Sequence, residues 1–171
     1  MTLRTVAVLA ALALPIAAAR AAPAAKATLH DAQGKEVGTA TLAEVPGGVS
    51  VHVQVASLPP GKHGIHIHAA GKCEGPDFKT AGPHFNPTGK KHGAHNPEGA
   101  HVGDMPNLDV GKDGKASATF TAKGAKLGEG EGSLLGPDGT AIVIHADPDD
   151  EKTDPAGNSG ARIACGVVEK K

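Results

Sequence analysis

Val49-Ser50-Val51-His52-Val53-Gln54-Val55 alternates a valine with a different residue at every step. Successive side chains of a β-strand point to opposite faces, so this alternation predicts a strand with one buried face and one solvated face. Pro46-Gly47-Gly48 precedes the stretch and Pro59-Pro60-Gly61 follows it, and both carry turn chemistry. The stretch therefore predicts a β fold bounded by tight turns.

The same type of pattern extends outward in both directions, without helical periodicity of useful length. Strands are predicted over Ala27–His30, Val37–Ala43, His63–His68, Val110–Gly114, Lys115–Ala122, Thr140–His145 and Arg162–Val168. Seven or eight short strands favour an antiparallel β-sandwich or barrel. Residues 125–135 are glycine-rich and ambiguous. Residues 69–105 and 147–160 lack regular patterning, and loops of such length are usually functional or disordered.

Composition limits the class of protein further. The chain has 171 residues, the usual length of one domain, and it contains no Trp, no Tyr and three Phe, so its core must be small and aliphatic. A net charge of −1 gives no electrostatic case for nucleic acid or an anionic membrane as a partner. Ten histidines are the compositional anomaly, and they require an explanation.

The first residues resemble an export signal. Arg4 precedes an apolar run over Val6–Ala19, and Ala19-Arg20-Ala21 offers small residues at a cleavage site. We therefore predict a signal peptide over residues 1–22 and a single domain over residues 23–171. The mature chain is expected in the periplasm, or secreted, with no segment inserted in a membrane.

Two cysteines remain, Cys73 and Cys165. In an exported chain an even count predicts one disulfide, and two free thiols are the alternative.

The segment Gly64-Ile65-His66-Ile67-His68 places two imidazoles on the same face of a strand. Imidazole suits copper, zinc, iron and nickel, so this pair could be half of a transition-metal site. An isolated pair would more often be a surface feature. Further candidate ligands follow it in the chain: His84, His92, His101, Asp104 and His145. Three imidazoles and one carboxylate suit tetrahedral zinc, whereas His66, His68 and His145 need a fourth ligand to form a four-nitrogen copper site.

Six blocks resemble copper/zinc superoxide dismutase, in order and over nearly all of the mature chain. They are Gly64-Ile65-His66-Ile67-His68, Ala81-Gly82-Pro83-His84-Phe85-Asn86-Pro87, Lys91-His92-Gly93, His101-Val102-Gly103-Asp104, Val143-Ile144-His145 and Gly157-Asn158-Ser159-Gly160-Ala161-Arg162-Ile163-Ala164-Cys165-Gly166-Val167. The resemblance implies an eight-stranded Greek-key barrel of the immunoglobulin-like sandwich type.

The resemblance also implies a role for each matching residue. Copper would be bound by His66, His68, His84 and His145, and zinc by His84, His92, His101 and Asp104. The ring of His84 would bridge both metals and Asp149 would link His66 to His92, with Asp147 and Asp150 as competitors for that role. Arg162 would lie beside copper as a catalytic residue together with His84. A Cys73–Cys165 disulfide would hold the metal-binding loop to the barrel, and His63 would bond backbone without binding metal.

The implied activity is conversion of superoxide to dioxygen and hydrogen peroxide, with one copper and one zinc per subunit. A homodimer is the family's expected assembly, although no interface can be assigned from the sequence. The position of Cys73 resembles that in the bacterial secreted branch. The run Asp149–Asp154 departs from the family's usual charged loop, which leaves the substrate-steering side chains open, and His95 has no ligand counterpart.

Two rival interpretations use the same histidines. One is an exported copper or zinc binding or carrier protein, which would not need Arg162. The other is an inactive dismutase-like domain, which the complete ligand set disfavours.

Overall fold

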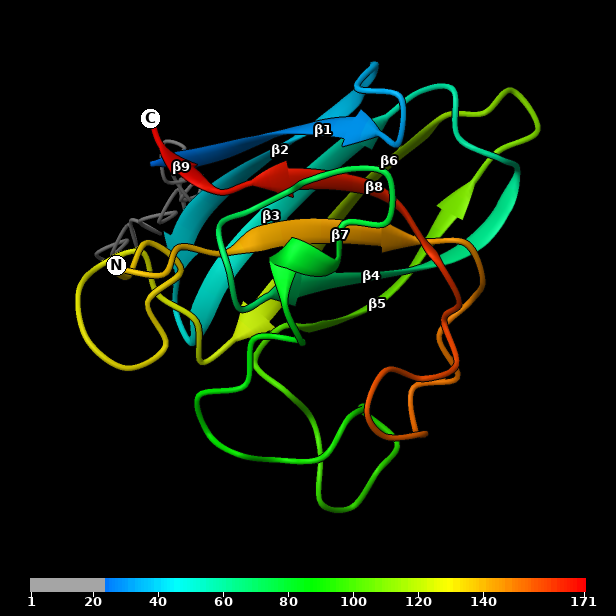
Figure 1. Cartoon of the computed structure of the whole chain (residues 1–171). Coiled ribbons are helices and arrows are strands. Elements are labelled where there is room, and N and C mark those ends of the chain that lie inside the picture. The colour runs from blue at the N-terminus through cyan, green and yellow to red at the C-terminus, as the bar shows by residue number, and fades with distance from the viewer. Residues whose placement is uncertain (1–23) are drawn as a thin grey trace, which may run out of the picture.

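The computed structural model describes residues 24–171, so the expected signal peptide lies outside the described residues. The fold is all-β (Figure 1). Its strands are β1 (Ala25–Asp31), β2 (Glu36–Val45), β3 (Gly48–Val55), β4 (Gly61–His68), β5 (Asp104–Val110), β6 (Ala116–Lys123), β7 (Ala141–His145), β8 (Arg162–Val167) and β9 (Glu169–Lys170). A single 3₁₀ turn, η1 (Lys79–Ala81), interrupts the long segment after β4 within the described part of the chain.

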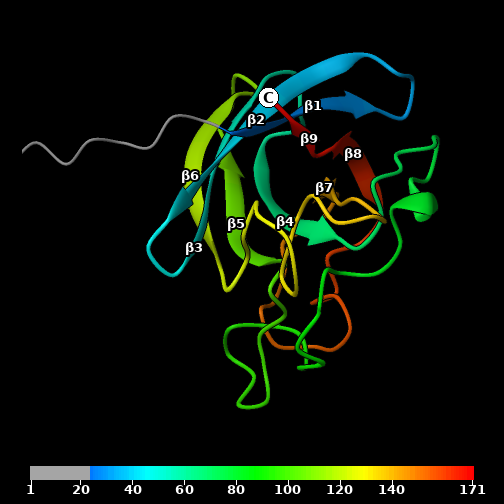
Figure 2. The same ribbon diagram turned by 90° about the vertical axis from the view of Figure 1, so that its left-hand side faces the viewer.

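Eight strands form one antiparallel sheet in the order β5-β4-β7-β8-β1-β2-β3-β6, and the short β9 pairs with β1. β5 and β6 stand at opposite ends of this order but are consecutive in the chain and contact each other. The sheet therefore curls into a nearly closed barrel around an aliphatic core, as Figure 2 shows. This architecture confirms the predicted eight-stranded barrel.

The valine-rich stretch behaves as its alternation predicts. β3 lies between β2 and β6, with Val51 opposite Leu42 on one side and Phe120 on the other. Val49, Val51 and Val53 are fully buried, and burying a valine contributes about 1.5–3 kcal/mol relative to exposure. The intervening residues lie on the outer face of the barrel.

β4 is buried on both faces over its second half. Ile65 and Ile67 point into the barrel core, and both are inaccessible to solvent. His66 and His68 alternate with them and are also buried, so they lie under the segments 69–103 and 146–161. These two segments leave opposite ends of the antiparallel strands β4 and β7 but lie on the same side of the barrel (Figure 1). The N–H of His95 donates to the carbonyl of Glu151 across them.

Two details of the predicted secondary structure are wrong. The predicted strand over Val110–Gly114 is instead β5, which lies almost entirely before Val110, and residues 111–115 form the turn. The sequence does not reveal β5 clearly, because Pro106 lies within it and is unusual in a strand. Its pairing with β4 is also irregular near His63, and this irregularity breaks the alternation of buried and exposed residues. The segment 69–105 was also expected to lack regular structure, yet it contains η1 and the start of β5.

The predicted disulfide is present. Cys73 and Cys165 are bonded, with their Cα atoms 5.6 Å apart. The bond ties the segment after β4 to β8, next to the strand end that carries Arg162. Within residues 24–171, no helix is long and apolar enough to cross a membrane.

Candidate metal centre

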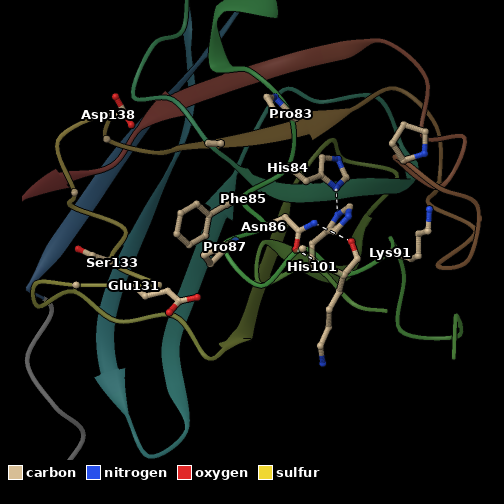
Figure 3. Close-up of a pocket in the computed structure, with 18 of the residues that line it drawn as sticks. Pro83, His84, Phe85, Asn86, Pro87, Lys91, His101, Glu131, Ser133 and Asp138 are labelled. Atoms are coloured by element: carbon tan, nitrogen blue, oxygen red, sulfur yellow. Dashed lines mark hydrogen bonds between the residues drawn. The ribbon is translucent and has the colours of Figure 1, made fainter. Parts of the chain in front are cut away.

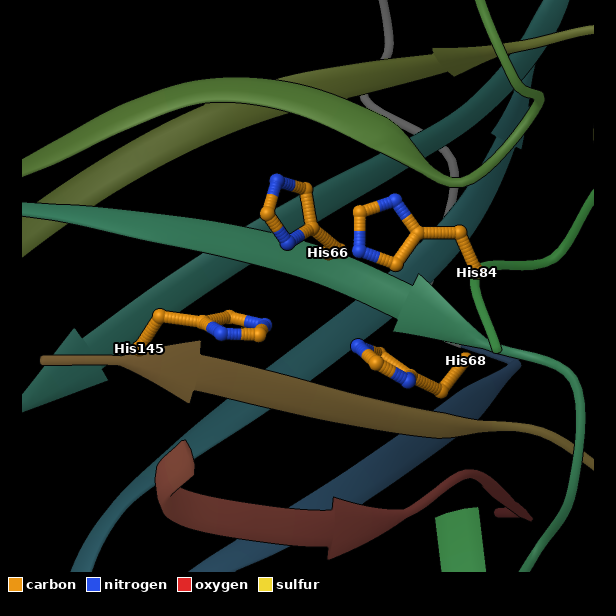
Figure 4. A group of neighbouring side chains, drawn as sticks. All are labelled: His66, His68, His84 and His145. Atoms are coloured by element: carbon orange, nitrogen blue, oxygen red, sulfur yellow. The ribbon is translucent and has the colours of Figure 1, made fainter. Parts of the chain in front are cut away.

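Four histidine rings converge on the outer face of the antiparallel strand pair β4 and β7 (Figure 4). His66 and His68 come from β4, and His145 comes from the end of the adjacent strand β7. His84 reaches the group because its segment pairs briefly with the end of β4, with hydrogen bonds from Phe85 N–H to Ile67 O and from Ala69 N–H to Pro83 O. The structure thus brings together the four residues predicted to bind copper.

One nitrogen of each ring is buried without a hydrogen-bond partner in the described structure. These atoms are His66 Nδ1, His68 Nε2, His84 Nε2 and His145 Nε2. One ligand atom from each residue lies within 4.8 Å of the others. A buried polar atom without a partner costs about 1–3 kcal/mol, so four such nitrogens in one place fit a metal ion that binds them all.

Hydrogen bonds at the opposite ring nitrogens orient these rings. His66 Nε2 donates to Asp149 Oδ2 at 2.7 Å and His68 Nδ1 donates to the carbonyl of Gly82 at 2.8 Å. His145 Nδ1 lies 3.3 Å from the carbonyl of Gly160. Each contact places the proton away from the centre of the group and leaves a lone pair facing it, as metal binding requires.

Burial favours the neutral form of three of the four rings, those of His68, His84 and His145. Desolvation, supported by the neighbouring imidazoles, lowers the pKa of His68 to about 2 and that of His145 to about 3. Burial also lowers the pKa of His84 to about 4, although the carboxylate of Asp104 acts in the opposite direction. All three rings can therefore bind a metal at neutral pH without first losing a proton.

A second group surrounds the carboxylate of Asp104. Its Oδ1 lies 3.0 Å from His84 Nδ1, 3.1 Å from His92 Nδ1 and 3.2 Å from His101 Nδ1, and the last atom is 3.4 Å from His84 Nδ1. A tetrahedron with bonds of about 2.0 Å from metal to ligand has edges of about 3.3 Å. Four of the six edges of the second group therefore have the length expected for a tetrahedral zinc site.

Backbone donors hold the Asp104 carboxylate in place. Its Oδ2 accepts hydrogen bonds from the N–H groups of Gly93 and His101, both at 2.9 Å. Oδ1 is left facing the three imidazoles, and these contacts hold the pKa of Asp104 well below its usual value despite burial.

His84 belongs to both groups, alone among the residues within 24–171. Its Nε2 faces the four-histidine group and its Nδ1 faces Asp104 and His101. A single imidazole ring thus separates the two candidate metal positions.

Asp149 links the groups by a second path. Its Oδ1 lies 3.0 Å from His92 Nε2, while Oδ2 accepts the bond from His66. Burial alone would depress the pKa of His92, but the carboxylates of Asp104 and Asp149 outweigh it and raise that pKa to about 9. The predicted link between His66 and His92 thus has the required geometry.

Asn107 supports Asp149 and was not predicted from the sequence. Its Nδ2 donates to the carbonyl of Asp149 at 2.9 Å, and its Oδ1 accepts the N–H of Asp149 at 2.7 Å. No motif marks Asn107, because its role depends on folding that brings β5 against the 146–161 segment.

Arg162 lies at the opening above the four histidines. Its Nη1 donates to the carbonyl of Phe78 at 2.6 Å and its Nη2 to the carbonyl of Gly82 at 2.7 Å. Gly82 thus orients both Arg162 and His68, which sequence reasoning missed because the contacts use its backbone. The opening is lined by His68, Lys79, Gly82, Pro83, His84, His145, Pro155, Ala156 and Arg162.

His95 lies outside both groups. Its side chain is 71% exposed, and its Nδ1 is 3.7 Å from a carboxylate oxygen of Glu151. This position agrees with its lack of a counterpart among the expected ligands.

Comparison with known proteins assigns the family. The sequence profile of copper/zinc superoxide dismutase matches residues 36–168. A protein named superoxide dismutase [Cu-Zn] 1 from Aquifex aeolicus is 46% identical over 145 residues, covering 84% of this chain and 86% of its own. A superoxide dismutase [Cu-Zn] from Caulobacter vibrioides is 42% identical over 151 residues, covering 85% of each chain.

Solved structures agree with the sequence relatives. A crystal structure of a SOD-like protein from Bacillus subtilis superposes with a TM-score of 0.80 at 43% identity, covering 83% of this chain and 96% of that one. The β-barrel, the two metal-type groups and these matches define an oxidoreductase of the copper- and zinc-dependent class. The chain belongs to the copper/zinc superoxide dismutase family.

Proposed function

We propose that this chain converts superoxide to dioxygen and hydrogen peroxide at a copper ion whose neighbour is zinc. Copper would be bound by His66, His68, His84 and His145, and zinc by His84, His92, His101 and Asp104. The observation that carries the proposal is the ring of His84, which presents one nitrogen to each group. A simple carrier of either metal would not need that shared ring.

Copper, when bound, supplies the one-electron redox chemistry that dismutation requires, whereas zinc has no redox chemistry. Two superoxide anions and two protons yield one dioxygen and one hydrogen peroxide. The side chains of the site therefore have two tasks, which are to admit an anion and to deliver protons.

Arg162 performs the first task. A guanidinium stays charged at neutral pH, and its planar donors suit a small anion. The carbonyls of Phe78 and Gly82 hold this plane at the opening. Lys79 adds a second cationic side chain to the lining, and its ammonium is paired with the carboxylate of Asp77 at 2.8 Å. Positive potential in such an opening raises association rates by about 10- to 10³-fold.

His84 performs the second task. Its Nε2 can hold a proton on the side of the four-histidine group, while Nδ1 stays oriented toward Asp104. A proton held at Nε2 would lie inside the four-histidine group, where departing peroxide can accept it. The second proton comes from water.

The disulfide supports a proposal for the cellular setting. Such a bond persists in an oxidising compartment, so we propose that residues 1–22 are removed on export and that residues 23–171 act in the periplasm or outside the cell. The family relationship also favours a homodimer, which analytical ultracentrifugation would test.

The substitution His84→Ala tests the proposal. We expect this variant to lose most of its superoxide consumption. Its affinity for zinc should fall, and three histidines should still hold copper. His95→Ala is the matched control, because it removes an exposed histidine from the same segment. The copper and zinc content per chain should be measured for each variant, together with the rate of superoxide consumption after rapid mixing. Full activity in the His84→Ala variant would refute the shared-ring role, and a doubly loaded parent chain without activity would refute the function.

A further inference from the structure

Two separate openings lead to the two metal groups. The first is the opening that carries Arg162 and Lys79, above His68 and His145. The second is a groove of about 700 Å³ on another side of His84, between the segment 83–91 and the loop 130–139. Figure 3 shows His84 and His101 on one side of this groove, with Glu131 and Asp138 across from them.

The charges of the two openings differ in kind. Arg162 and Lys79 line the first opening, and because Asp77 pairs with the ammonium of Lys79 at 2.8 Å, its cationic character comes mainly from Arg162. The groove contains three carboxylates, those of Glu131, Asp138 and Asp154, together with the two lysines Lys90 and Lys91. An anion is therefore favoured at the first opening. Of the two linings, that of the groove contains the carboxylates, so a divalent cation is favoured there.

Asp154 stands between the groove and the zinc-type group. Its Oδ1 accepts the N–H of His92 at 2.8 Å and lies 3.9 Å from His101 Nε2. Its Oδ2 is 3.6 Å from the ammonium of Lys91. The side chain of Asp154 is 40% exposed, whereas that of His101 is 7% exposed. Asp154 is therefore a solvent-accessible carboxylate one step outside the ligands.

We propose that zinc enters and leaves the protein through this groove and that Asp154 binds it transiently on the way. When no zinc ion is passing, the ammonium of Lys91 pairs with the Asp154 carboxylate instead. A cation arriving at Asp154 displaces the exposed ammonium and is then near His101 Nε2, so it must pass the edge of this ring to reach Nδ1, the atom that faces Asp104. It reaches its ligands without crossing the cationic opening or the four-histidine group. The inference rests on the proposed zinc ligand set, and it makes His84 the partition between an anion path and a cation path.

A residue on a path changes the rates of uptake and release together and leaves the affinity unchanged, whereas a positioning residue changes the affinity. Asp154→Asn removes the charge but keeps an oxygen that can accept the His92 N–H. Asp113→Asn is the matched control, since Asp113 is also exposed and also accepts a backbone N–H, that of Lys115. We expect Asp154→Asn to slow zinc uptake and release by about 3- to 10-fold, the low end of electrostatic effects on rates.

The measurement is exchange of isotopically labelled zinc into the copper- and zinc-loaded full chain, with zinc affinity from chelator competition. Lys91→Gln should accelerate exchange relative to Lys112→Gln, and added salt should reduce both differences. Lys79→Glu, at the first opening, should leave zinc exchange unchanged.

Equal exchange rates for Asp154→Asn and Asp113→Asn would overturn the inference, as would faster exchange in Lys79→Glu. A parent chain that holds no zinc would instead refute the proposed ligand set. The two failures are therefore distinguishable.

Discussion

Replacing Gly157 with alanine should uncouple Asp149 from the metal ligands. Gly157 has a φ of +62°, a conformation that side chains disfavour by about 1–2 kcal/mol. A Cβ at this position would overlap the carboxylate of Asp149 and lie 2.7 Å from His92 Nε2. The carboxylate must therefore move, and its bonds to His66 and His92 cannot both persist.

Gly157→Ala should weaken metal binding in addition to straining the backbone. Loss of an outer partner of a metal-binding histidine lowers metal affinity by about 10- to 100-fold. Gly157→Ala should produce a loss of that size for zinc and a similar or smaller loss for copper, because Asp149 bonds one candidate ligand of each metal. Chelator competition on the folded protein would measure both affinities.

Gly89 supplies the control for strain alone. Its φ is +64°, and nothing lies within 4 Å of the position of an added Cβ. Gly89→Ala should lower stability by about 1–2 kcal/mol and leave metal affinity near normal. Equal metal affinities in the two variants would refute the reasoning, because the clash with Asp149 would then have no consequence.

Four further predictions concern the opening, zinc binding, the metal-free chain and the disulfide. Arg162→Ala should lower the rate constant for superoxide by about 10-fold or more and weaken azide inhibition, with copper and zinc contents unchanged; parallel loss of copper would show a structural role. The raised pKa of His92, about 9, means that zinc binding at pH 7 should release about one proton, which calorimetry in buffers of different ionisation enthalpy would detect. The same shift stabilises the metal-free chain fully below about pH 6.5, and that stabilisation should be lost as the pH rises through about 9; stability that is flat over this range would contradict it. Replacing Cys73 and Cys165 with serine opens a loop of 92 residues, which should cost about 4–5 kcal/mol in denaturant unfolding; a loss below about 1 kcal/mol would contradict the chain-entropy estimate.

Regular patterning made most of the barrel predictable. The alternation over Val49–Val55 is strong because one face of β3 packs in the core and the other faces outward. β5 was misplaced because Pro106 and an irregular pairing interrupt its alternation. Its position depends on contacts with β4, which a local pattern does not contain.

The candidate ligands were predictable for a different reason. Each is a residue type that binds metals, and each lies in a sequence block that matches the family in the same order along the chain. Asn107 and the carbonyl of Gly82 were missed because they act through contacts between distant segments, 42 residues apart for Asn107 and Asp149. The groove beside His101 was missed for the same reason.

The central claim is that one ring, that of His84, joins the two metals. A crystal structure of the Cu(II)- and zinc-loaded protein, with anomalous data at both absorption edges, tests it directly. We expect a copper peak bound by His84 Nε2 and a zinc peak bound by His84 Nδ1. A structure in which His84 binds one metal alone, or in which the two metals are exchanged, would contradict it.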